Sequence, residues 1–268
     1  ELTARPLVSV LIPNKDHTDD LRRCLDSLVQ KAGYENLELL VVENNSAQPE
    51  TFAFYEKELP QYPNCRLLTY KGPFNFSAIN NFAAREAKGG QLLLLNNDIE
   101  LLSDGFITEL LMYAQRPDVG AVGAKLYYPD DKIQHAGVFI GIGGSAGHSH
   151  KGLPRGNKGN LYRLSTAQNM SAVTGACLMV KAELYHKLGG LDEHQFAVSY
   201  NDVDFCLRLR QEGYLNVFTP YAEAYHYESK SRGLDTGGPN AQRYQGERQR
   251  FCKKYEALIL GGDPYYNP

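Results

Sequence analysis

One carboxylate lies shortly after the most apolar run of the sequence. Residues 92–95 are four leucines, and they are followed by Asn96, Asn97 and Asp98. Carboxylate and amide oxygens are the ligands that Mg²⁺ or Mn²⁺ prefers when substrate phosphates complete the coordination shell. Asp98 is therefore a candidate metal ligand. The alternative is a purely local role, in which Asp98 caps a helix that begins near Ser103.

A second candidate group lies in the segment YHYESKSRG, residues 225–233. His226 is a candidate for a further metal ligand, because imidazole binds metal ions readily. Lys230, Ser231 and Arg232 are candidates to hold a diphosphate through charge-assisted hydrogen bonds. An imidazole without a functional role is the alternative for His226, since charged clusters mark functional sites only statistically.

Two further carboxylates, Asp202 and Asp204, open the amphipathic run NDVDFCLRLRQEG at residues 201–213. Acidic residues are favoured in the first turn of a helix by the helix dipole, which explains at least one of them. The functional alternative is a general base that deprotonates an incoming hydroxyl group, a task that needs one acid.

Several common catalytic and nucleotide-binding motifs do not occur. GIGG at residues 141–144 lacks the G-x-G-x-x-G spacing of a dinucleotide loop. The sequence has no G-x-x-x-x-G-K-[ST] phosphate loop and no G-x-S-x-G element of a serine hydrolase. Neither a P-loop nucleotidase nor a serine hydrolase is therefore expected.

The elements that must position these residues alternate regularly in the first half of the chain. β-Branched and leucine-rich runs predict strands at 7–12, 37–42, 65–70 and 91–95, and amphipathic runs predict helices at 19–32, 50–59 and 77–88. Strands that alternate with helices at this spacing predict an α/β fold with a doubly wound, mostly parallel sheet.

The second half is less regular. It predicts a helix at 103–115 with Ser103 as its cap, strands at 119–128, 174–180 and 215–220, and a helix at 201–213 that ends at Gly213. Residues 141–170 are rich in Gly, Ser and Asn without a clear period, which predicts a long, mobile excursion.

Polar residues follow each of the first four predicted strands, as PNKD, ENNS, KGPFN and NND. Ligands of open parallel sheets bind beyond the carboxyl ends of the strands. Asp98 is thus expected at a binding edge.

Composition excludes several classes of protein. The chain of 268 residues is 43% hydrophobic with a formal net charge of −3, so it has ample core and no basic stripe for nucleic acid. No apolar run is long enough to span a bilayer, no signal-peptide layout occurs, and the five cysteines form no C-x-x-C pair. We therefore expect a cytoplasmic protein with free thiols, either complete or cut from a longer chain, since it begins without Met.

Six ordered segments together resemble the family 2 glycosyltransferases, the inverting GT-A enzymes that use nucleotide-diphosphate sugars. These segments are IPNKD, VVENNS, NND, TGACLMV, NDVDFCLRLR and HYESKSRG, and the resemblance runs from about residue 7 to 235. It implies a GT-A-like sheet with flanking helices in one domain over residues 1–268. Its parts would be a nucleotide-binding half (1–100), a donor-sugar and acceptor half (101–239) and a C-terminal helix and tail (240–268).

The resemblance implies a role for each matching residue on the nucleotide side. The residues that would lie against the nucleotide are Pro13, Asn14, Asp16, Glu43, Asn75, Asn80 and Asn97, and Lys230, Ser231 and Arg232 would hold its diphosphate. Asp98 matches the metal-binding member of the D-x-D signature, with His226 as a further ligand. A divalent cation, Mn²⁺ or Mg²⁺, is the implied cofactor.

On the sugar side, the resemblance implies that Asp202 is the general base for the acceptor hydroxyl. Thr174, Gly175 and Ala176 match the wall near the donor sugar, and His135 is a candidate lining residue. Asn201 replaces the Glu of the family's Glu-Asp pair, which puts in doubt the role of that Glu in orienting the acceptor. Asn96 replaces the first Asp of D-x-D, which weakens a two-carboxylate metal site.

The implied reaction is a single displacement that moves a sugar from a UDP-sugar, or next from a dTDP-sugar, to a hydroxyl of a glycan or glycoprotein, with inversion. Two alternatives stay open: a degenerate domain that binds nucleotide or glycan, and a sugar-nucleotide pyrophosphorylase, although IPNKDHTDD lacks the glycines of its loop. Contact with the inner face of a membrane, further domains and self-association also stay open.

Overall fold

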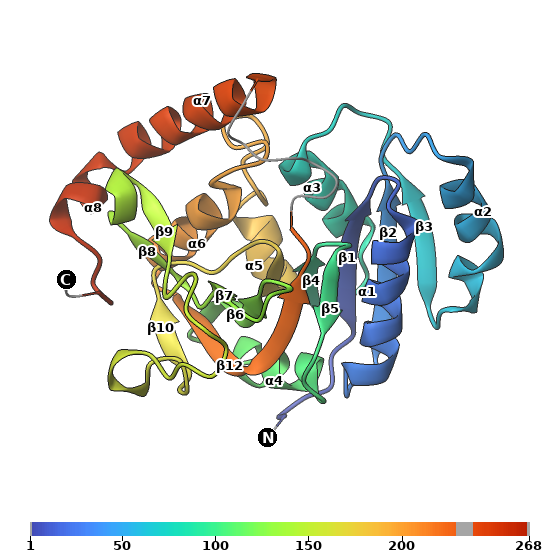
Figure 1. Ribbon diagram of the computed structural model, residues 1–268, viewed down its shortest axis with the longest axis horizontal. Helices are drawn as coiled ribbons and strands as arrows, with labels where there is room; N and C mark the ends of the chain where they lie inside the picture. Colours follow the sequence, from blue (N-terminus) through green and yellow to red (C-terminus); the bar gives the residue numbers. More distant parts are fainter. Residues whose placement is uncertain (1, 229–237, 267–268) are drawn as a thin grey trace.

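The computed structural model describes residues 2–228 and 238–266. Within them, one ten-stranded sheet runs through the molecule with helices on both sides (Figure 1). Its strands are β1 (Val8–Asn14), β2 (Leu37–Glu43), β3 (Cys65–Thr69), β4 (Gln91–Leu95), β5 (Ile99–Leu101), β6 (Val119–Tyr127), β7 (Ile133–His135), β10 (Gln168–Met170), β11 (Cys177–Lys181) and β12 (Leu215–His226). A separate hairpin joins β8 (Val138–Ile140) and β9 (Ala146–His148).

The main path of the sheet has the order β10-β12-β6-β11-β4-β1-β2-β3. Strands β3, β2, β1 and β4 are parallel, and β12 is parallel to β6, whereas β11 runs antiparallel between β4 and β6. Most strands therefore point the same way, which confirms the expected doubly wound, mostly parallel sheet. The carboxyl ends of β1, β2 and β4 meet at one edge.

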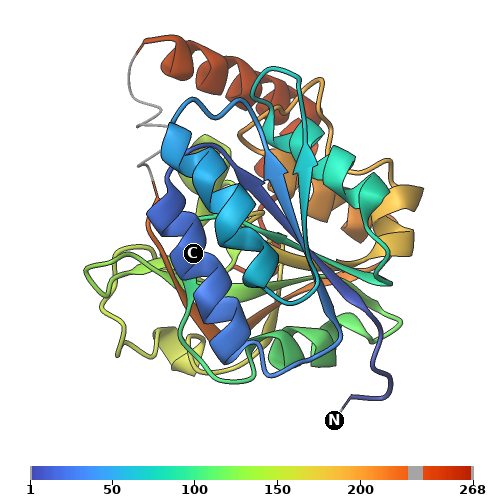
Figure 2. The same cartoon turned by 90° about the vertical axis from the view of Figure 1, so that its right-hand side faces the viewer.

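The helices cover both faces of this sheet. They are α1 (Thr18–Lys31), α2 (Pro49–Lys57), α3 (Phe76–Glu86), α4 (Phe106–Ala114), α5 (Ala182–Lys187), α6 (Asn201–Gln211), α7 (Gly238–Lys254) and α8 (Glu256–Gly261), with single 3₁₀ turns at η1 (Leu59–Gln61), η2 (Ile142–Gly144) and η3 (Asn160–Tyr162). Buried side chains of α1, α2 and α4 pack on one face, and those of α3, α5, α6 and α7 on the other. Figure 2 shows α1 and α2 on one side of the first strands and α3 on the other.

The four-leucine run of β4 is explained by these two layers. Leu93 and Leu95 belong to the core under α1 and α4, whereas Leu92 and Leu94 belong to the core under α3 and α5. A strand buried on both faces reads as continuously apolar rather than alternating. The run is therefore the centre of the sheet, and it delivers the residues after it to the binding edge.

Three expectations need correction. The helix predicted at 103–115 is α4, which begins after Gly105, and Ser103 does not cap it, because its hydroxyl accepts a hydrogen bond from the backbone N–H of Glu223 at 2.9 Å. The excursion at 141–170 contains η2, β9, η3 and β10 rather than only loop. The strand predicted at 215–220 is longer.

This longer strand is β12, which continues to His226. Its pairing with β6 shifts register between Phe218 and Glu223, around Pro220, which has no N–H to donate. Proline thus interrupts the ladder without ending the strand, and the second part of β12 reaches the binding edge.

No helix in residues 2–228 or 238–266 is long and apolar enough to cross a membrane. All five cysteines are free, as expected from their spacing.

Candidate active site

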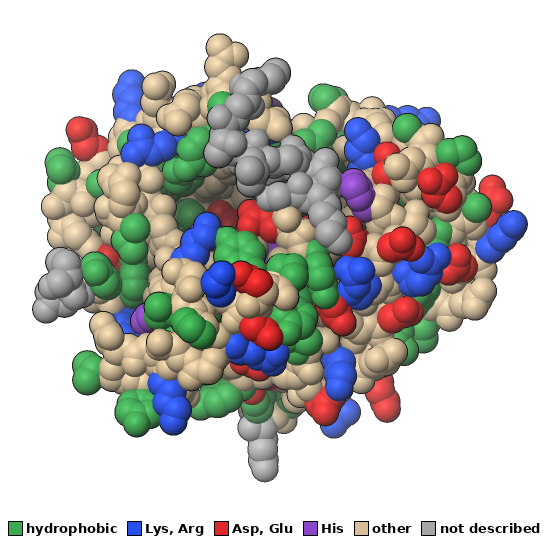
Figure 3. Space-filling model, viewed as in Figure 1, with side chains coloured by type: hydrophobic (Ala, Val, Ile, Leu, Met, Phe, Trp, Pro, Cys, Tyr) green, Lys and Arg blue, Asp and Glu red, His purple; other side chains and the backbone are tan. Residues whose placement is uncertain are grey.

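Two adjoining cavities open at the carboxyl edge of the sheet, and Figure 3 shows a hollow in the face seen in Figure 1. The Asp98 cavity is lined by Pro13, Asn14, Lys15, Asn44, Phe74, Ile79, Asn97, Asp98, Asn240 and Arg243. The Asp202 cavity is lined by Val138, Ala146, Gly147, His148, Thr174, Gly175, Ala176, Val198, Ser199, Tyr200, Asn201, Asp202, Val203 and Tyr244. Phe76, Asn96, His226 and Glu228 line both cavities, so the two are continuous.

Strand pairing brings Asp98 and His226 together from distant parts of the chain. After β4 the chain turns through Asp98 into β5, and β5 pairs with the end of β12, where Ile99 lies opposite His226. The backbone N–H of Tyr227 donates to the carbonyl of Asp98 at 3.0 Å. As a result, Nε2 of His226 lies 3.2 Å from Oδ1 of Asp98, and both side chains are largely buried.

A hydrogen-bond chain fixes the tautomer of His226. The Gln134 amide nitrogen donates to Oε2 of Glu228 at 2.9 Å, which turns its Oε1 towards Nδ1 of His226 at 2.7 Å. Because Oε1 only accepts, Nδ1 carries a proton. In the neutral ring, Nε2 then presents a lone pair to Asp98, with the Asn96 amide nitrogen 3.2 Å away.

This pair fits a divalent cation. A carboxylate oxygen and an imidazole nitrogen that lie 3.2 Å apart can bind the same cation, and the proton on Nδ1 is held by an outer partner, as is usual for metal-binding histidines. No group of three or more His, Cys, Asp and Glu side chains that could hold a metal occurs in the part of the chain that the structure describes. An ion at Asp98 and His226 would therefore take further ligands from the substrate.

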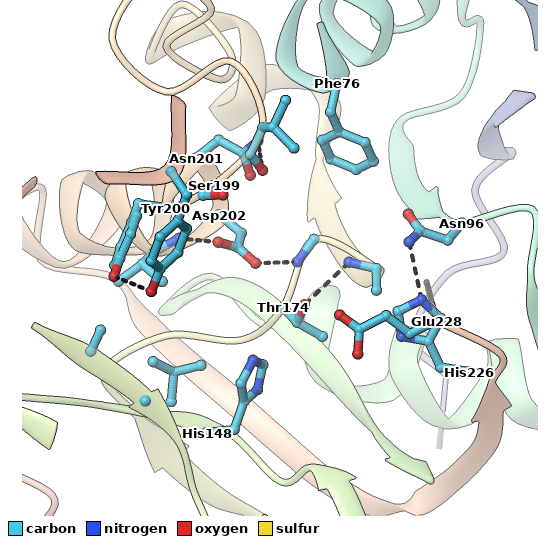
Figure 4. Close-up of a pocket in the computed structure, with 18 residues that line it drawn as sticks. Phe76, Asn96, His148, Thr174, Ser199, Tyr200, Asn201, Asp202, His226 and Glu228 are labelled. Carbon is cyan, nitrogen blue, oxygen red and sulfur yellow. Dashed lines mark hydrogen bonds between the residues drawn. The ribbon is translucent and has the colours of Figure 1, made fainter. Parts of the chain in front are cut away.

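The start of α6 presents Asp202 to the other cavity. Its Oδ2 accepts a hydrogen bond from the backbone N–H of Gly175 at 2.8 Å, and this bond is drawn in Figure 4. Tyr200, the residue immediately before α6, caps the helix in the left-handed region, with φ of 64°. A non-glycine residue in this conformation is costly and marks a backbone that its surroundings hold in place.

Asp204, the second carboxylate of this helix, is structural. It is fully buried. Its oxygens accept hydrogen bonds from Arg208 at 2.8 Å, Lys254 at 2.6 Å and Tyr255 at 2.7 Å. The ambiguity between the two aspartates is thus resolved, since only Asp202 faces a cavity.

The predicted wall residues lie around Asp202. Thr174, Gly175 and Ala176 line the cavity beside it. Asn201 also lines it and is held by a hydrogen bond from its amide nitrogen to the carbonyl of Val198 at 3.0 Å.

Only part of the predicted nucleotide-binding set lines the Asp98 cavity. Pro13, Asn14 and Asn97 do, and the Asn97 amide nitrogen donates to Oδ1 of Asn14 at 2.6 Å. Lys230, Ser231 and Arg232 lie outside the described residues.

Four residues predicted to contact the nucleotide line neither cavity, because their side chains form hydrogen bonds within the fold. Asp16 accepts hydrogen bonds from the backbone before α2, and Glu43 accepts from Ser46 and from Tyr55 at 2.7 Å. Asn75 caps α3 by accepting from the Ala78 N–H at 2.9 Å, and Asn80 is buried and donates to the carbonyl of Phe76 at 2.8 Å.

Several residues that line the two cavities were not predicted from the sequence. Glu228 stands between His226 and the basic cluster, where it could have been noticed by position. His135 is fully buried and lies behind the Asp202 cavity, whereas His148, from the excursion at 141–170, lines this cavity together with His226. Tyr200 and Tyr244 belong to no sequence motif. They meet only because α7 packs against α6, and their hydroxyl oxygens then lie 3.1 Å apart.

The fold is that of the GT-A glycosyltransferases. The structure superimposes on the mannosyltransferase PcManGT from Pyrobaculum calidifontis, solved in complex with GDP-Man and Mn²⁺, with a TM-score of 0.65 and 17% identity over 96% of this chain and 65% of that one.

Residues 5–242 match the family described as glycosyltransferase like family 2, so the chain belongs to this family and is a glycosyltransferase domain. It is 43% identical over 98% of its length to the uncharacterized protein y4gI of Sinorhizobium fredii, of which it covers 29%. It is 42% identical, also over 98%, to the O-antigen biosynthesis protein RfbC of Myxococcus xanthus, of which it covers 20%. The chain thus spans less than a third of either relative.

Proposed function

We propose that this domain is a metal-dependent, inverting glycosyltransferase. It moves a sugar from a nucleotide-diphosphate donor, a UDP-sugar first and a dTDP-sugar next, to a hydroxyl of a glycan acceptor. Asp202 is the general base. The donor nucleotide occupies the Asp98 cavity, and the acceptor occupies the Asp202 cavity.

The observation that carries this proposal is the shared wall of the two cavities. Figure 4 shows Asp202 on one side of the segment that begins at Thr174, and His226 with Glu228 on the other. A donor whose diphosphate lies at Asp98 and His226 would extend its sugar past Thr174 towards Asp202. Base and leaving group then flank the anomeric carbon, as a single displacement requires.

Asp202 accepts the proton of the acceptor hydroxyl as its oxygen attacks the anomeric carbon. The bond from this carbon to the diphosphate oxygen breaks at the same time, and the configuration inverts. The hydrogen bond from Gly175 keeps one oxygen of Asp202 fixed. Only one carboxylate acts, unlike the pair that glycoside hydrolases use.

Asp98 and His226 would hold a divalent cation, which would neutralise charge on the departing diphosphate, with Mn²⁺ favoured over Mg²⁺ because imidazole would be one of the ligands. The solved relative with Mn²⁺ supports a metal-dependent reaction.

The nucleotide is bound by a mixed surface. Phe74, which is 48% exposed, and Phe76 offer apolar faces for the base, while Asn14 and Asn44 offer amide groups. Asp16, Glu43, Asn75 and Asn80 act by shaping the loops around this surface. We further propose that Lys230, Ser231 and Arg232 contact the diphosphate.

The acceptor is proposed to be a growing bacterial surface polysaccharide, ahead of a glycoprotein. The likeness to an O-antigen biosynthesis protein supports this choice, although this chain covers only 20% of that protein. The reaction would then take place in the cytoplasm, at the inner face of the membrane, where nucleotide sugars are available.

Calorimetric titration of UDP, dTDP and GDP, with and without Mn²⁺, tests the donor side. We expect one nucleotide to bind in a Mn²⁺-dependent manner and Asp98→Ala to abolish this dependence. Asp104→Ala, which removes a carboxylate that is 86% exposed, is the matched control and should bind like the wild type.

The titration also separates the alternatives. Binding of a nucleotide by a protein that hydrolyses none of the corresponding sugar nucleotides would indicate a degenerate binding domain. Absence of binding with all three nucleotides, with and without metal, would refute the proposal.

A further inference from the structure

His148 reaches into the Asp202 cavity from a hairpin that no sequence motif marks. It lies on β9, opposite Val138 of β8. Figure 4 shows its ring pointing from this hairpin into the cavity that Asp202 faces from the other side. The side chain is exposed to the cavity.

His135 holds this ring from behind. Nδ1 of His135 lies 2.8 Å from Nδ1 of His148, and the two rings are nearly perpendicular, at 83°. The other ring nitrogen of His135, Nε2, accepts hydrogen bonds from the backbone N–H groups of Gly137 at 3.3 Å and Thr174 at 3.4 Å. Two donors on Nε2 mean that this atom carries a lone pair rather than a proton.

These contacts fix the tautomers of both rings. If Nε2 of His135 accepts, its single proton lies on Nδ1 and is donated to Nδ1 of His148. The neutral ring of His148 then carries its proton on Nε2. This Nε2–H group has no hydrogen-bond partner in residues 2–228 or 238–266, so it is available to a ligand in the cavity.

Desolvation favours the neutral form of both rings. It lowers the pKa of His135 well below its usual value, and it also lowers the pKa of His148, against the opposing effect of Asp202. Below neutral pH the pair therefore resists the protonation that would remove the acceptor on His148 Nδ1.

The surroundings of His148 suit a sugar ring. Phe76, Tyr200 and Tyr244 contribute aromatic faces, and Asp202 and Ser199 contribute polar groups. Carbohydrates combine apolar C–H faces with hydroxyl edges, and they are recognised by such mixtures of aromatic rings and hydrogen-bonding groups.

We infer that His148 is an acceptor-binding residue whose Nε2–H donates a hydrogen bond to an oxygen of the acceptor sugar, and that His135 is a positioning residue that fixes the required tautomer. The assignment to an acceptor rests on the proposed function. The tautomer of His148 does not depend on that function.

The tautomer is tested by ¹⁵N NMR of histidine-labelled protein, with the signals of His148 identified from the spectrum of His148→Gln. We expect His148 to be neutral with its proton on Nε2 in the wild type, and to become a mixture of tautomers in His135→Phe. A proton on Nδ1 of His148 in the wild type would overturn the inference, whether or not the domain is a transferase.

Binding is tested with p-nitrophenyl glycosides of glucose, galactose, N-acetylglucosamine and rhamnose as acceptor probes, and with the donor that calorimetry identifies. His148→Phe should raise the KM for the probe about tenfold, because one hydrogen bond is lost. Hydrolysis of the donor uses water as the acceptor, so the ratio of transfer to hydrolysis at a fixed probe concentration below KM should fall by about the same factor. His148→Gln, whose amide nitrogen replaces Nε2–H, should restore most of the affinity.

Equal losses of transfer and donor hydrolysis in His148→Phe would contradict the inference, as would equal effects of Phe and Gln. If no probe is a substrate, the same glycosides are titrated against the Nε2 signal of His148. A signal that moves with none of them would also overturn the inference. A wild type that neither binds nucleotide nor hydrolyses donor would instead refute the proposed function.

Discussion

Asp98 and Asp202 are held in different ways, and the difference matches their proposed roles. Asp98 faces an imidazole lone pair and is largely buried. Asp202 accepts backbone hydrogen bonds from Gly175 and Val203 and opens to a cavity. A buried carboxylate next to an imidazole is suited to a metal ion, whereas a carboxylate in an open cavity is suited to accept a proton from a substrate.

Asp202→Asn removes the base without changing the size of the side chain. We expect kcat for transfer to fall by about 10²–10⁴-fold, the usual contribution of general base catalysis. Nucleotide affinity should not change, because Asp202 lines the other cavity. Steady-state kinetics and calorimetry measure the two quantities, and an Asn variant with wild-type kcat would exclude Asp202 as the base.

Asn96→Asp restores a second carboxylate close to His226. The Asn96 amide nitrogen lies 3.2 Å from Nε2 of His226, so a carboxylate there would add an anionic ligand to the same position. Because ligand charge raises the affinity for divalent cations, half-saturation should occur at about tenfold lower Mn²⁺. Titration of Mn²⁺ in the presence of the nucleotide tests this, and Asn97→Asp provides a neighbouring control.

At the scale of the elements, α7 holds the segment that leads to α6, the helix that carries Asp202. Glu247 on α7 is fully buried, and its carboxylate accepts the backbone N–H groups of Val198 at 3.1 Å and Ser199 at 2.9 Å. Phe251 of the same helix stacks on Tyr200, with ring centroids 4.7 Å apart. The strained conformation of Tyr200 is therefore maintained by α7.

Glu247→Ala leaves these two N–H groups without their acceptor. We expect the free energy of unfolding to fall by about 2 kcal/mol and kcat to fall with it, because the start of α6 loses its support. Glu247→Gln keeps one acceptor oxygen, so its free energy of unfolding should lie between those of the wild type and Glu247→Ala. Denaturant unfolding measures the stability, and Glu256→Ala on the exposed side of α8 is the control. Unchanged stability in Glu247→Ala would show that α7 does not support this segment.

The elements of the first half could be predicted because each is specified locally. The leucines of β4 predict a strand buried on both faces, and Leu21, Leu25 and Leu28 predict the buried face of α1. The hairpin β8–β9 and the full length of β12 could not be predicted. They depend on pairing with distant strands, and Gly-rich or Pro-containing segments carry no period that reveals such pairing.

The same distinction applies to the site. The place of Asp98, His226 and Asp202 at the cavities could be predicted because they follow recognisable elements or stand in motifs. Whether Glu43 or Asp16 faces a ligand or the neighbouring loop depends on the direction of each side chain, which a sequence does not contain. The sequence contains both His148 and His135, but only the fold determines which of them lines the Asp202 cavity.

For the whole molecule, ligand binding should appear as a gain in stability. A ligand at about 100 times its Kd stabilises the folded state by about 2.7 kcal/mol, or about 5 °C for a domain of this size. We expect this shift with Mn²⁺ and the preferred nucleotide together and not in Asp98→Ala. Thermal unfolding followed by fluorescence measures it, and an equal shift in the variant would place the nucleotide elsewhere.

The two halves of the chain are joined within one sheet. Strand β11 lies between β4 and β6, and β5 pairs with β12. Asp98 and His226 therefore meet only when both halves are folded. We therefore predict that both halves fold together as one unit, without a folding boundary at residue 100.

The place of β11 also has a consequence for synthesis on the ribosome. When residues 91–95 leave the ribosome, β1 can pair with one side of β4, but the partner of its other side is encoded by residues 177–181. An apolar strand with an open edge is the kind of surface that recruits other chains. The nascent protein thus carries an open leucine-rich edge until residues 177–181 have been synthesised, and we predict that this interval is when it is most prone to associate with other chains.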